Sequence, residues 1–145
     1  MMRVVVWSVV CAALLAAPAL AKDQLMTFED NDQVTFVMPS NNVDCVYTPL
    51  GGSPTYVPEN GGPELSCDRA SPVYTNVRLI PGAPAAVTPN PGEQPCCSGT
   101  NTFAYGNTIN LGDDFLCSSL TTGLVCETAD KRHGFTISRA KILSH

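Results

Sequence analysis

The chain has little positive charge and almost no histidine, and both shortages exclude classes of function. Its 145 residues carry 8 lysines and arginines against 13 acids, for a net charge of -5. There is no basic run and no interleaving of basic with aromatic residues, so we expect no nucleic-acid partner. The two histidines, His133 and His145, are too few for a histidine-rich metal site. We therefore expect no metal and no other cofactor.

Long hydrophobic runs are also scarce, because only one stretch of the chain is continuously apolar. It covers residues 4–20, follows a short basic start, and ends in the small-x-small pattern Ala19-Leu20-Ala21 that a signal peptidase recognises. We predict that residues 1–21 are a signal peptide, which makes the product secreted or periplasmic. Since no second run follows, we expect no stable membrane insertion after signal cleavage.

Stretches without proline are short, which excludes long helices from most of the remaining chain. Eleven of the 12 prolines lie between Pro39 and Pro95. The segments between them are rich in Val, Thr, Tyr and Phe, as is typical of strands. We predict a flexible lead-in over 22–33 and, over 34–145, a single disulfide-stapled domain that is all-β or β-dominated. A short C-terminal helical turn over 139–143, capped by Ser138, is expected as well. The predicted strands are 34–38, 43–48, 65–69, 73–79, 102–105, 108–111, 115–118, 124–127 and 135–137.

Cysteine is the residue that the chain does have in excess for its size. Cleavage of the signal removes Cys11 and leaves six, an even number that indicates a disulfide framework in an exported domain. Cys117 and Cys126 lie on the two arms of a predicted hairpin, and Cys45 and Cys67 flank a long Gly/Pro loop. Each of these two pairings would stabilise the fold by about 3 kcal/mol on the chain-entropy model.

Cys96 and Cys97 are then left over, and they are adjacent in the chain. Neighbouring Cα atoms are about 3.8 Å apart, below the usual bridging range. Three alternatives remain open: a strained local ring, a rearranged connectivity with the other four cysteines, and unpaired or intermolecular thiols. A local ring would be the most easily reduced of the three bonds, and it is the only redox hypothesis that the sequence offers.

Several short motifs follow one another along the chain. They are Pro39-Ser40-Asn41-Asn42-Val43-Asp44-Cys45, Cys67-Asp68, Cys97-Ser98-Gly99, Tyr105-Gly106, Cys117-Ser118, Gly123-Leu124-Val125-Cys126 and His133-Gly134-Phe135-Thr136-Ile137-Ser138-Arg139. In this order the motifs resemble an uncharacterised family of small exported bacterial domains. Asn41 stands where that family has glycine, and Cys96 is additional. The resemblance implies an exported β-rich fold and no particular activity.

Catalytic candidates are few. His133 can be combined with Ser98 or Ser138, and with Asp68 as the acid, into the triad of a small hydrolase, but no Gly-x-Ser-x-Gly elbow frames either serine. We favour a structural hydrogen bond or a turn as the role of His133. The pair Asp113-Asp114 lacks the alternating oxygen ligands of a calcium loop, so a turn is favoured there too.

The favoured function is that of a non-catalytic domain that contacts an envelope or extracellular macromolecule. The Pro-rich segment 80–95 is either a spacer or a binding surface, since preordered extended chain presents its groups at low entropic cost. Two alternatives remain: the small hydrolase, and a protease inhibitor that exposes the loop at 50–63 or the segment 80–95.

Overall fold

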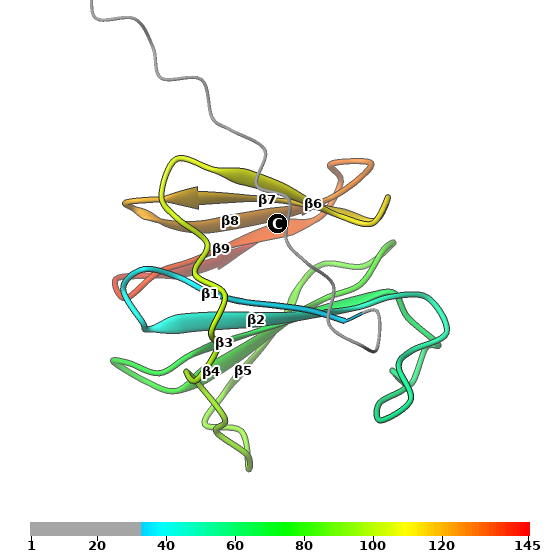
Figure 1. Cartoon of the computed structure of the whole chain (residues 1–145), viewed down its shortest axis with the longest axis horizontal. Coiled ribbons are helices and arrows are strands. Elements are labelled where there is room, and N and C mark those ends of the chain that lie inside the picture. Colours follow the sequence, from blue (N-terminus) through cyan, green and yellow to red (C-terminus); the bar gives the residue numbers. More distant parts are fainter. Residues whose placement is uncertain (1–32) are drawn as a thin grey trace, which may run out of the picture.

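The computed structural model describes residues 33–145, which form two antiparallel five-stranded sheets packed face to face (Figure 1). The predicted signal peptide and all of the lead-in except Gln33 lie outside the described residues. The all-β prediction is confirmed. Within residues 33–145, no helix has the length and apolar character needed to cross a membrane. The first sheet contains β1 (Val34–Val37), β2 (Val43–Thr48), β3 (Glu64–Arg69), β4 (Thr75–Leu79) and β5 (Ala86–Pro89). The second contains β6 (Thr108–Leu111), β7 (Phe115–Leu120), β8 (Gly123–Thr128), β9 (Gly134–Ile137) and β10 (Ile142–Ser144).

Each sheet is a meander in which every strand pairs with its neighbour in sequence. The short β7–β8 turn needs glycine, because a Cβ on Gly123 would lie 2.8 Å from the Ile137 carbonyl oxygen. The two meanders each carry one cross-strand disulfide between their second and third strands. Cys45 lies directly opposite Cys67, and Cys117 directly opposite Cys126. Both pairings predicted from the spacing are therefore present.

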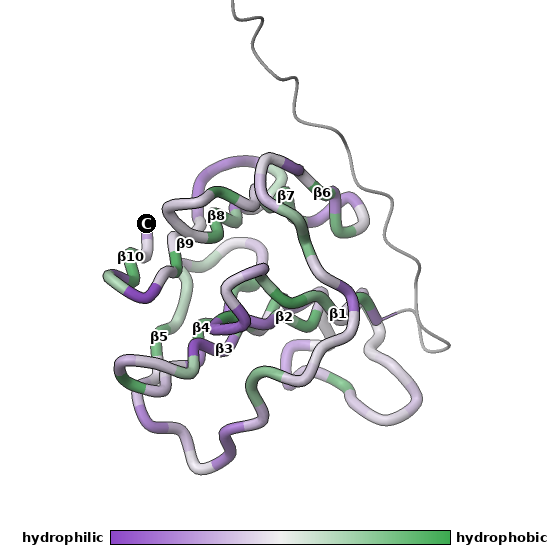
Figure 2. The backbone as a smooth tube through the Cα atoms, turned by 60° about the vertical axis from the view of Figure 1, so that its left-hand side comes forward, coloured by the Kyte–Doolittle hydropathy of each residue, from purple (hydrophilic) through white to green (hydrophobic). Residues whose placement is uncertain are grey.

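The core lies between the sheets, and hydrophobic residues are interspersed with hydrophilic ones along the strands (Figure 2). Alternation directs one face of each sheet inward. Phe36 of β1 packs edge-to-face on Phe103, with ring centroids 5.2 Å apart. Four phenylalanines at most 2% exposed fill the centre, and all four bridging cysteines of the sheets are buried beside them. The four are Phe36, Phe103, Phe115 and Phe135.

Polar contacts also join the sheets at the margin of this core. The Tyr47 hydroxyl on β2 donates a 2.8 Å hydrogen bond to Asp114 in the β6–β7 turn. The Arg69 guanidinium at the end of β3 donates to the Ser138 carbonyl, beyond β9, at 3.1 Å. A third bond runs from the Ser144 hydroxyl on β10 to the Ala85 carbonyl beside β5, at 2.9 Å, and together these contacts fix the relative position of the two layers.

The predicted C-terminal helical turn is not present. Ser138 Oγ does accept a hydrogen bond from the Lys141 amide at 3.2 Å, as an N-cap would. The residues that follow pair with β9 as the edge strand β10 instead of continuing into a helix. The free edge of β9 offers a full set of backbone partners, which a single helical turn would leave unmatched.

Two other local predictions need correction. Residues 102–105 form no strand, because Phe103 is drawn into the core and the segment keeps only an isolated bridge between Thr102 and Val37. Residues 80–95 are not purely a spacer, since Ala86–Pro89 pairs with β4 as an edge strand whose four residues are all exposed. Proline is tolerated at that end because an edge strand leaves one row of amides unpaired.

Candidate functional site

The outer face of the first sheet is crossed by residues 90–101, which we call the strap. Three adjoining hollows of about 400, 250 and 260 Å³ lie between the strap and the strands. Asp68 on β3 and Pro95 on the strap line all three, so the hollows meet at one place on the sheet. The outward side chains that line them are mostly polar: Thr35, Asp44, Thr48, Glu64, Ser66, Asn76, Arg78 and Thr88.

The cross-strand disulfide determines which residues face these hollows. Cys45 and Cys67 point inward, so the residues beside them point outward by strict alternation. Asp44 lies opposite Asp68 in the register of β2 and β3, and both side chains are partly buried. Two carboxylates therefore meet on the outer face at the point where the strap passes.

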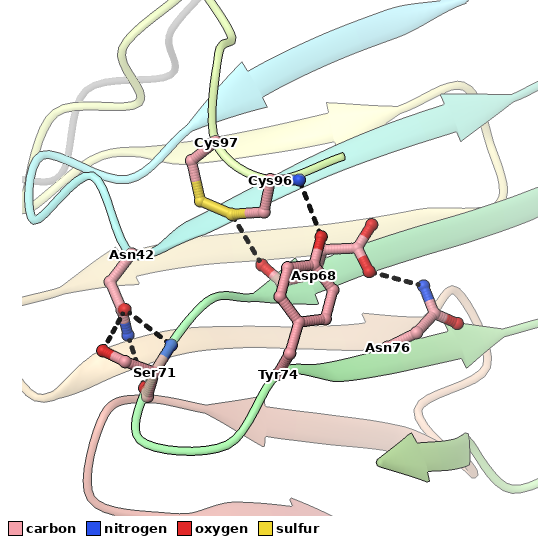
Figure 3. Close-up of a disulfide and its surroundings, with 7 residues drawn as sticks. All are labelled: Asn42, Asp68, Ser71, Tyr74, Asn76, Cys96 and Cys97. Atoms are coloured by element: carbon pink, nitrogen blue, oxygen red, sulfur yellow. Dashed lines mark hydrogen bonds between the residues drawn. A yellow bond between two sulfur atoms is a disulfide. The ribbon is translucent and has the colours of Figure 1, made fainter. Parts of the chain in front are cut away.

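The strap is tied down on both sides of its two cysteines. On the N-terminal side, the amide of Cys96 itself donates a 2.6 Å hydrogen bond to the hydroxyl of Tyr74, a residue only 9% exposed (Figure 3). After them, the Val37 amide donates to the Asn101 carbonyl at 2.8 Å. Gly99 fits against Val37, where an added Cβ would lie 3.4 Å from the valine Cβ. The strap is thus held at a fixed height above β2 and β3.

Cys96 and Cys97 are bonded to each other, which selects the local ring from the three alternatives (Figure 3). The Cα atoms are 3.1 Å apart, and the sulfur of Cys96 lies 3.5 Å from the Asp68 carbonyl oxygen. Both cysteines are partly exposed, unlike the other four. A sulfur-rich, partly accessible group therefore lies directly over the paired carboxylates.

A buried amide supports the same corner of the sheet. Asn42, 4% exposed, accepts hydrogen bonds from the Ser71 amide at 3.0 Å and from its hydroxyl at 2.9 Å. In return its Nδ2 donates to the Ser71 carbonyl at 3.0 Å (Figure 3). These bonds join the entry to β2 with the β3–β4 turn, and so they hold Asp44 and Tyr74 in fixed relative positions.

The paired carboxylates are electrostatically perturbed. Burial, reinforced by the charge of Asp68, raises the pKa of Asp44 to about 6, although a backbone hydrogen bond from Ser98 acts in the opposite direction. Burial also raises the pKa of Asp68, and its hydrogen bond from Asn76 partly offsets that effect. Further along the face, Glu64 accepts a 2.9 Å hydrogen bond from Tyr56 and lies 3.5 Å from the Arg78 guanidinium. Glu64 therefore has a cationic neighbour, whereas burial and the charge of Asp68 hold the pKa of Asp44 at about 6.

The structure does not bring the candidate hydrolase residues together. His133 lies in the β8–β9 turn, where its backbone carbonyl accepts from the Thr128 amide at 2.9 Å. Its backbone amide donates to the Thr128 hydroxyl at 3.2 Å. Ser138 lies at the other end of β9, five residues and roughly 16 Å away at the usual rise of a strand. Ser98 is on the strap, over the opposite sheet. Of the four residues considered, only Ser98 and Asp68 lie by the same hollow.

Asp113 and Asp114 occupy the turn between β6 and β7. Asp114 accepts the Tyr47 hydroxyl, while Asp113 is exposed. That arrangement uses one carboxylate for structure and leaves the other in solvent.

Four structurally important polar residues could not be singled out from the sequence motifs: Asn42, Asp44, Arg69 and Tyr74. A signal for Asp44 was present: once Cys45 and Cys67 are paired, the antiparallel register places Asp44 opposite Asp68. No comparable signal existed for Tyr74, because its partner lies 22 residues away on an irregular segment.

Comparison of the chain with protein-family models, curated proteins and solved structures finds no match.

Proposed function

We propose that this chain is an exported, non-catalytic binding domain that uses the outer face of its first sheet to contact a positively charged segment of an envelope or extracellular protein. Its export by the predicted signal peptide, its bacterial origin and its motif resemblance to the exported bacterial family belong to the same proposal. Three disulfides in so small a domain support an oxidising compartment.

The observation that carries the proposal is the junction of three hollows at Asp68, beneath a strap anchored at both ends. Surface of this shape offers an extended partner several contacts that are already in place, which lowers the entropy lost on binding. The charge on the face favours a cation. Asp44, Glu64, Asp68 and Glu93 line the hollows, against Arg78 as their single cationic side chain.

A capture experiment tests the proposal. The domain over residues 22–145, produced with its disulfides formed, is immobilised and exposed to envelope and extracellular proteins of the source cell. We expect a captured protein whose retention falls about tenfold in the double variant Asp44→Asn, Asp68→Asn and weakens as salt is added.

Two variants serve as controls. Asp113→Asn removes an exposed carboxylate from the second sheet, and His133→Ala removes the imidazole. Both should retain the partner at the wild-type level. Equal retention by the double variant, or loss of retention in a folded His133→Ala variant, would refute the binding face, and a measured activity that His133→Ala abolishes without unfolding the domain would refute the non-catalytic assignment.

A further inference from the structure

The strap and β2 bring together three groups that can ligate a metal. One carboxylate oxygen of Asp44 and the sulfurs of Cys96 and Cys97 all lie within 4.8 Å of one another. Among residues 33–145 no other trio of His, Cys, Asp or Glu ligand atoms is so closely placed. In the oxidised protein the two sulfurs are bonded to each other, so the group is available to a metal only after that bond is opened.

The surrounding contacts keep the three groups in place without help from the disulfide itself. Tyr74 holds the Cys96 amide, Val37 holds the strap at Asn101, and Asp44 is on a central strand of the first sheet. Opening the bond therefore leaves two thiols over the same carboxylate instead of releasing a loose loop. A site whose ligands are already positioned binds a metal with less loss of conformational entropy.

Access distinguishes this disulfide from the other two. Cys45, Cys67, Cys117 and Cys126 are 0–1% exposed in the core, whereas both strap cysteines are partly exposed. Exchange requires a thiolate to reach a sulfur atom. An external dithiol therefore reaches the strap disulfide while the two sheet disulfides remain closed.

We propose that a dithiol reductant converts the Cys96–Cys97 disulfide into a binding site for one thiophilic metal ion, with the two cysteine sulfurs and the Asp44 carboxylate as ligands. The attacking thiolate first forms a mixed disulfide with one strap sulfur and releases the other as a thiolate. The second reductant thiol then displaces the first strap sulfur. The dithiol is oxidised to a disulfide, and its two electrons and two protons pass to Cys96 and Cys97.

Metal binding follows as a separate step, in which the two thiols lose their protons and coordinate the ion as thiolates. Two thiolates and one carboxylate supply three negative charges, and soft sulfur selects Zn²⁺, Cd²⁺ or Cu⁺ over Mg²⁺ and Ca²⁺. Three protein ligands leave a fourth tetrahedral position for water or another donor. The site thus adds to the proposed partner surface a metal-binding property that exists only in the reduced protein.

The test uses Cd²⁺ as the probe, because thiolate coordination to cadmium gives an ultraviolet charge-transfer band. The purified domain is treated with dithiothreitol, desalted without oxygen and titrated, beside an untreated sample. We expect two free thiols per reduced chain, mapped by alkylation and mass spectrometry to Cys96 and Cys97. The reduced chain should bind one Cd²⁺ with the charge-transfer band, and the oxidised chain should show no such band.

Variants assign the ligands. The double variant Cys96→Ser, Cys97→Ser keeps both sheet disulfides and should lose the band entirely, while its circular dichroism stays that of the wild type. Asp44→Asn should weaken Cd²⁺ binding by about tenfold or more. The matched control Asp113→Asn removes an equal charge from the opposite sheet and should leave the affinity within about twofold.

Each contrary outcome overturns the inference. If dithiothreitol opens no disulfide, or opens a sheet disulfide as readily, the selective access is wrong. If reduced and oxidised chains bind Cd²⁺ alike, or the double serine variant keeps the band, the sulfurs are not the ligands. The proposed partner surface is tested in the oxidised chain, so either proposal can fail without the other.

Discussion

Tyr74 and Cys96 are joined by a 2.6 Å hydrogen bond in which the cysteine amide donates to the tyrosine hydroxyl. This bond connects the outer face of the first sheet to the strap, and it is made by the first of the two bonded cysteines. Because Tyr74 is almost fully buried, its hydroxyl has little access to water as an alternative partner. The Tyr74 side chain therefore helps to position the strap from below, beside Asp44, which accepts a backbone hydrogen bond from Ser98.

Replacing Tyr74 with phenylalanine should loosen the strap without emptying the space that the ring occupies. The Cys96 amide loses its acceptor, so we expect a decrease of about 1 kcal/mol in the free energy of unfolding and faster reduction of the Cys96–Cys97 bond by a dithiol. Urea unfolding and timed alkylation measure the two effects. Tyr105→Phe, at a tyrosine that is 41% exposed, is the control and should change neither. An unchanged reduction rate in Tyr74→Phe would show that the hydrogen bond does not hold the strap.

Asp44 should make the domain less stable as the pH rises through the weakly acidic range. Its pKa is about 6 in the folded chain against an ordinary value of 3.8, so the folded state holds the proton more tightly than the unfolded state. The stabilising contribution of the protonated carboxyl is complete below about pH 4 and is lost by about pH 6 to 7. After a discount for partial exposure, we expect a loss of about 1 to 2 kcal/mol.

Asp44→Asn should reduce this slope to the contribution of Asp68, whose pKa burial also raises, and be the more stable form at neutral pH. Urea unfolding of the oxidised, metal-free protein between about pH 4 and 7 provides the measurement. Asp113→Asn, at an exposed carboxyl, should keep the wild-type slope. If the slope is undiminished in Asp44→Asn, Asp44 is not the group responsible for it.

The two sheet disulfides should contribute unequally to stability. Cys45 and Cys67 close a loop with a sequence separation of 22, and Cys117 and Cys126 one with a separation of 9. On the chain-entropy model the longer loop is worth about 3.4 kcal/mol and the shorter about 2.6 kcal/mol. Paired alanine substitutions at each bridge should therefore cost more in the first sheet, as measured by urea unfolding. A larger loss in the second sheet would indicate that packing around the cysteines outweighs the entropy of the unfolded chain.

The bond from Tyr47 to Asp114 should stabilise the contact between the sheets. Tyr47→Phe keeps the edge-to-face packing on Phe115, whose ring centroid is 6.0 Å away, and removes only the hydroxyl. Because the acceptor is a carboxylate, we expect a loss of about 1 to 2 kcal/mol in unfolding free energy. Asp114→Asn tests the same bond from the other partner. In a double-mutant cycle the two effects should be less than additive, and full additivity would mean that the residues do not interact.

Most of the strands could be predicted from local pattern alone. The segment 43–48 alternates in hydrophobicity and is β2 to the residue, and the strand predicted at 108–111 is β6. The secondary-structure predictions were wrong where the chain leaves a sheet. Phenylalanine is common in strands, yet the ring of Phe103 fills the centre of the core and its backbone runs between the sheets. Ser138 accepts the hydrogen bond expected of a cap, from the Lys141 amide. The residues after it nevertheless pair with the open edge of β9, so the predicted helical turn at 139–143 is a hairpin instead.

Only part of the candidate site could be predicted from the local pattern of the sequence. Pairing of Cys45 with Cys67 follows from spacing, and the facing of Asp44 and Asp68 follows from that pairing. The position of Cys96 and Cys97 above the two carboxylates does not follow from that pairing. The sequence left three alternatives for Cys96 and Cys97, because nothing local to them indicates which part of the sheet they approach.

By itself, the sequence determined a β-rich chain and favoured two cross-strand disulfides, since alternation and hairpin spacing are properties of neighbouring residues. Only the tertiary structure decided where the strap runs, which cysteines remain accessible, and which carboxyl lies beneath them. The physical reason is that an irregular segment has no repeating backbone pattern of its own. Its position is set by single hydrogen bonds to distant residues, such as Tyr74 and Val37, whose partners become known only when the sheets are assembled.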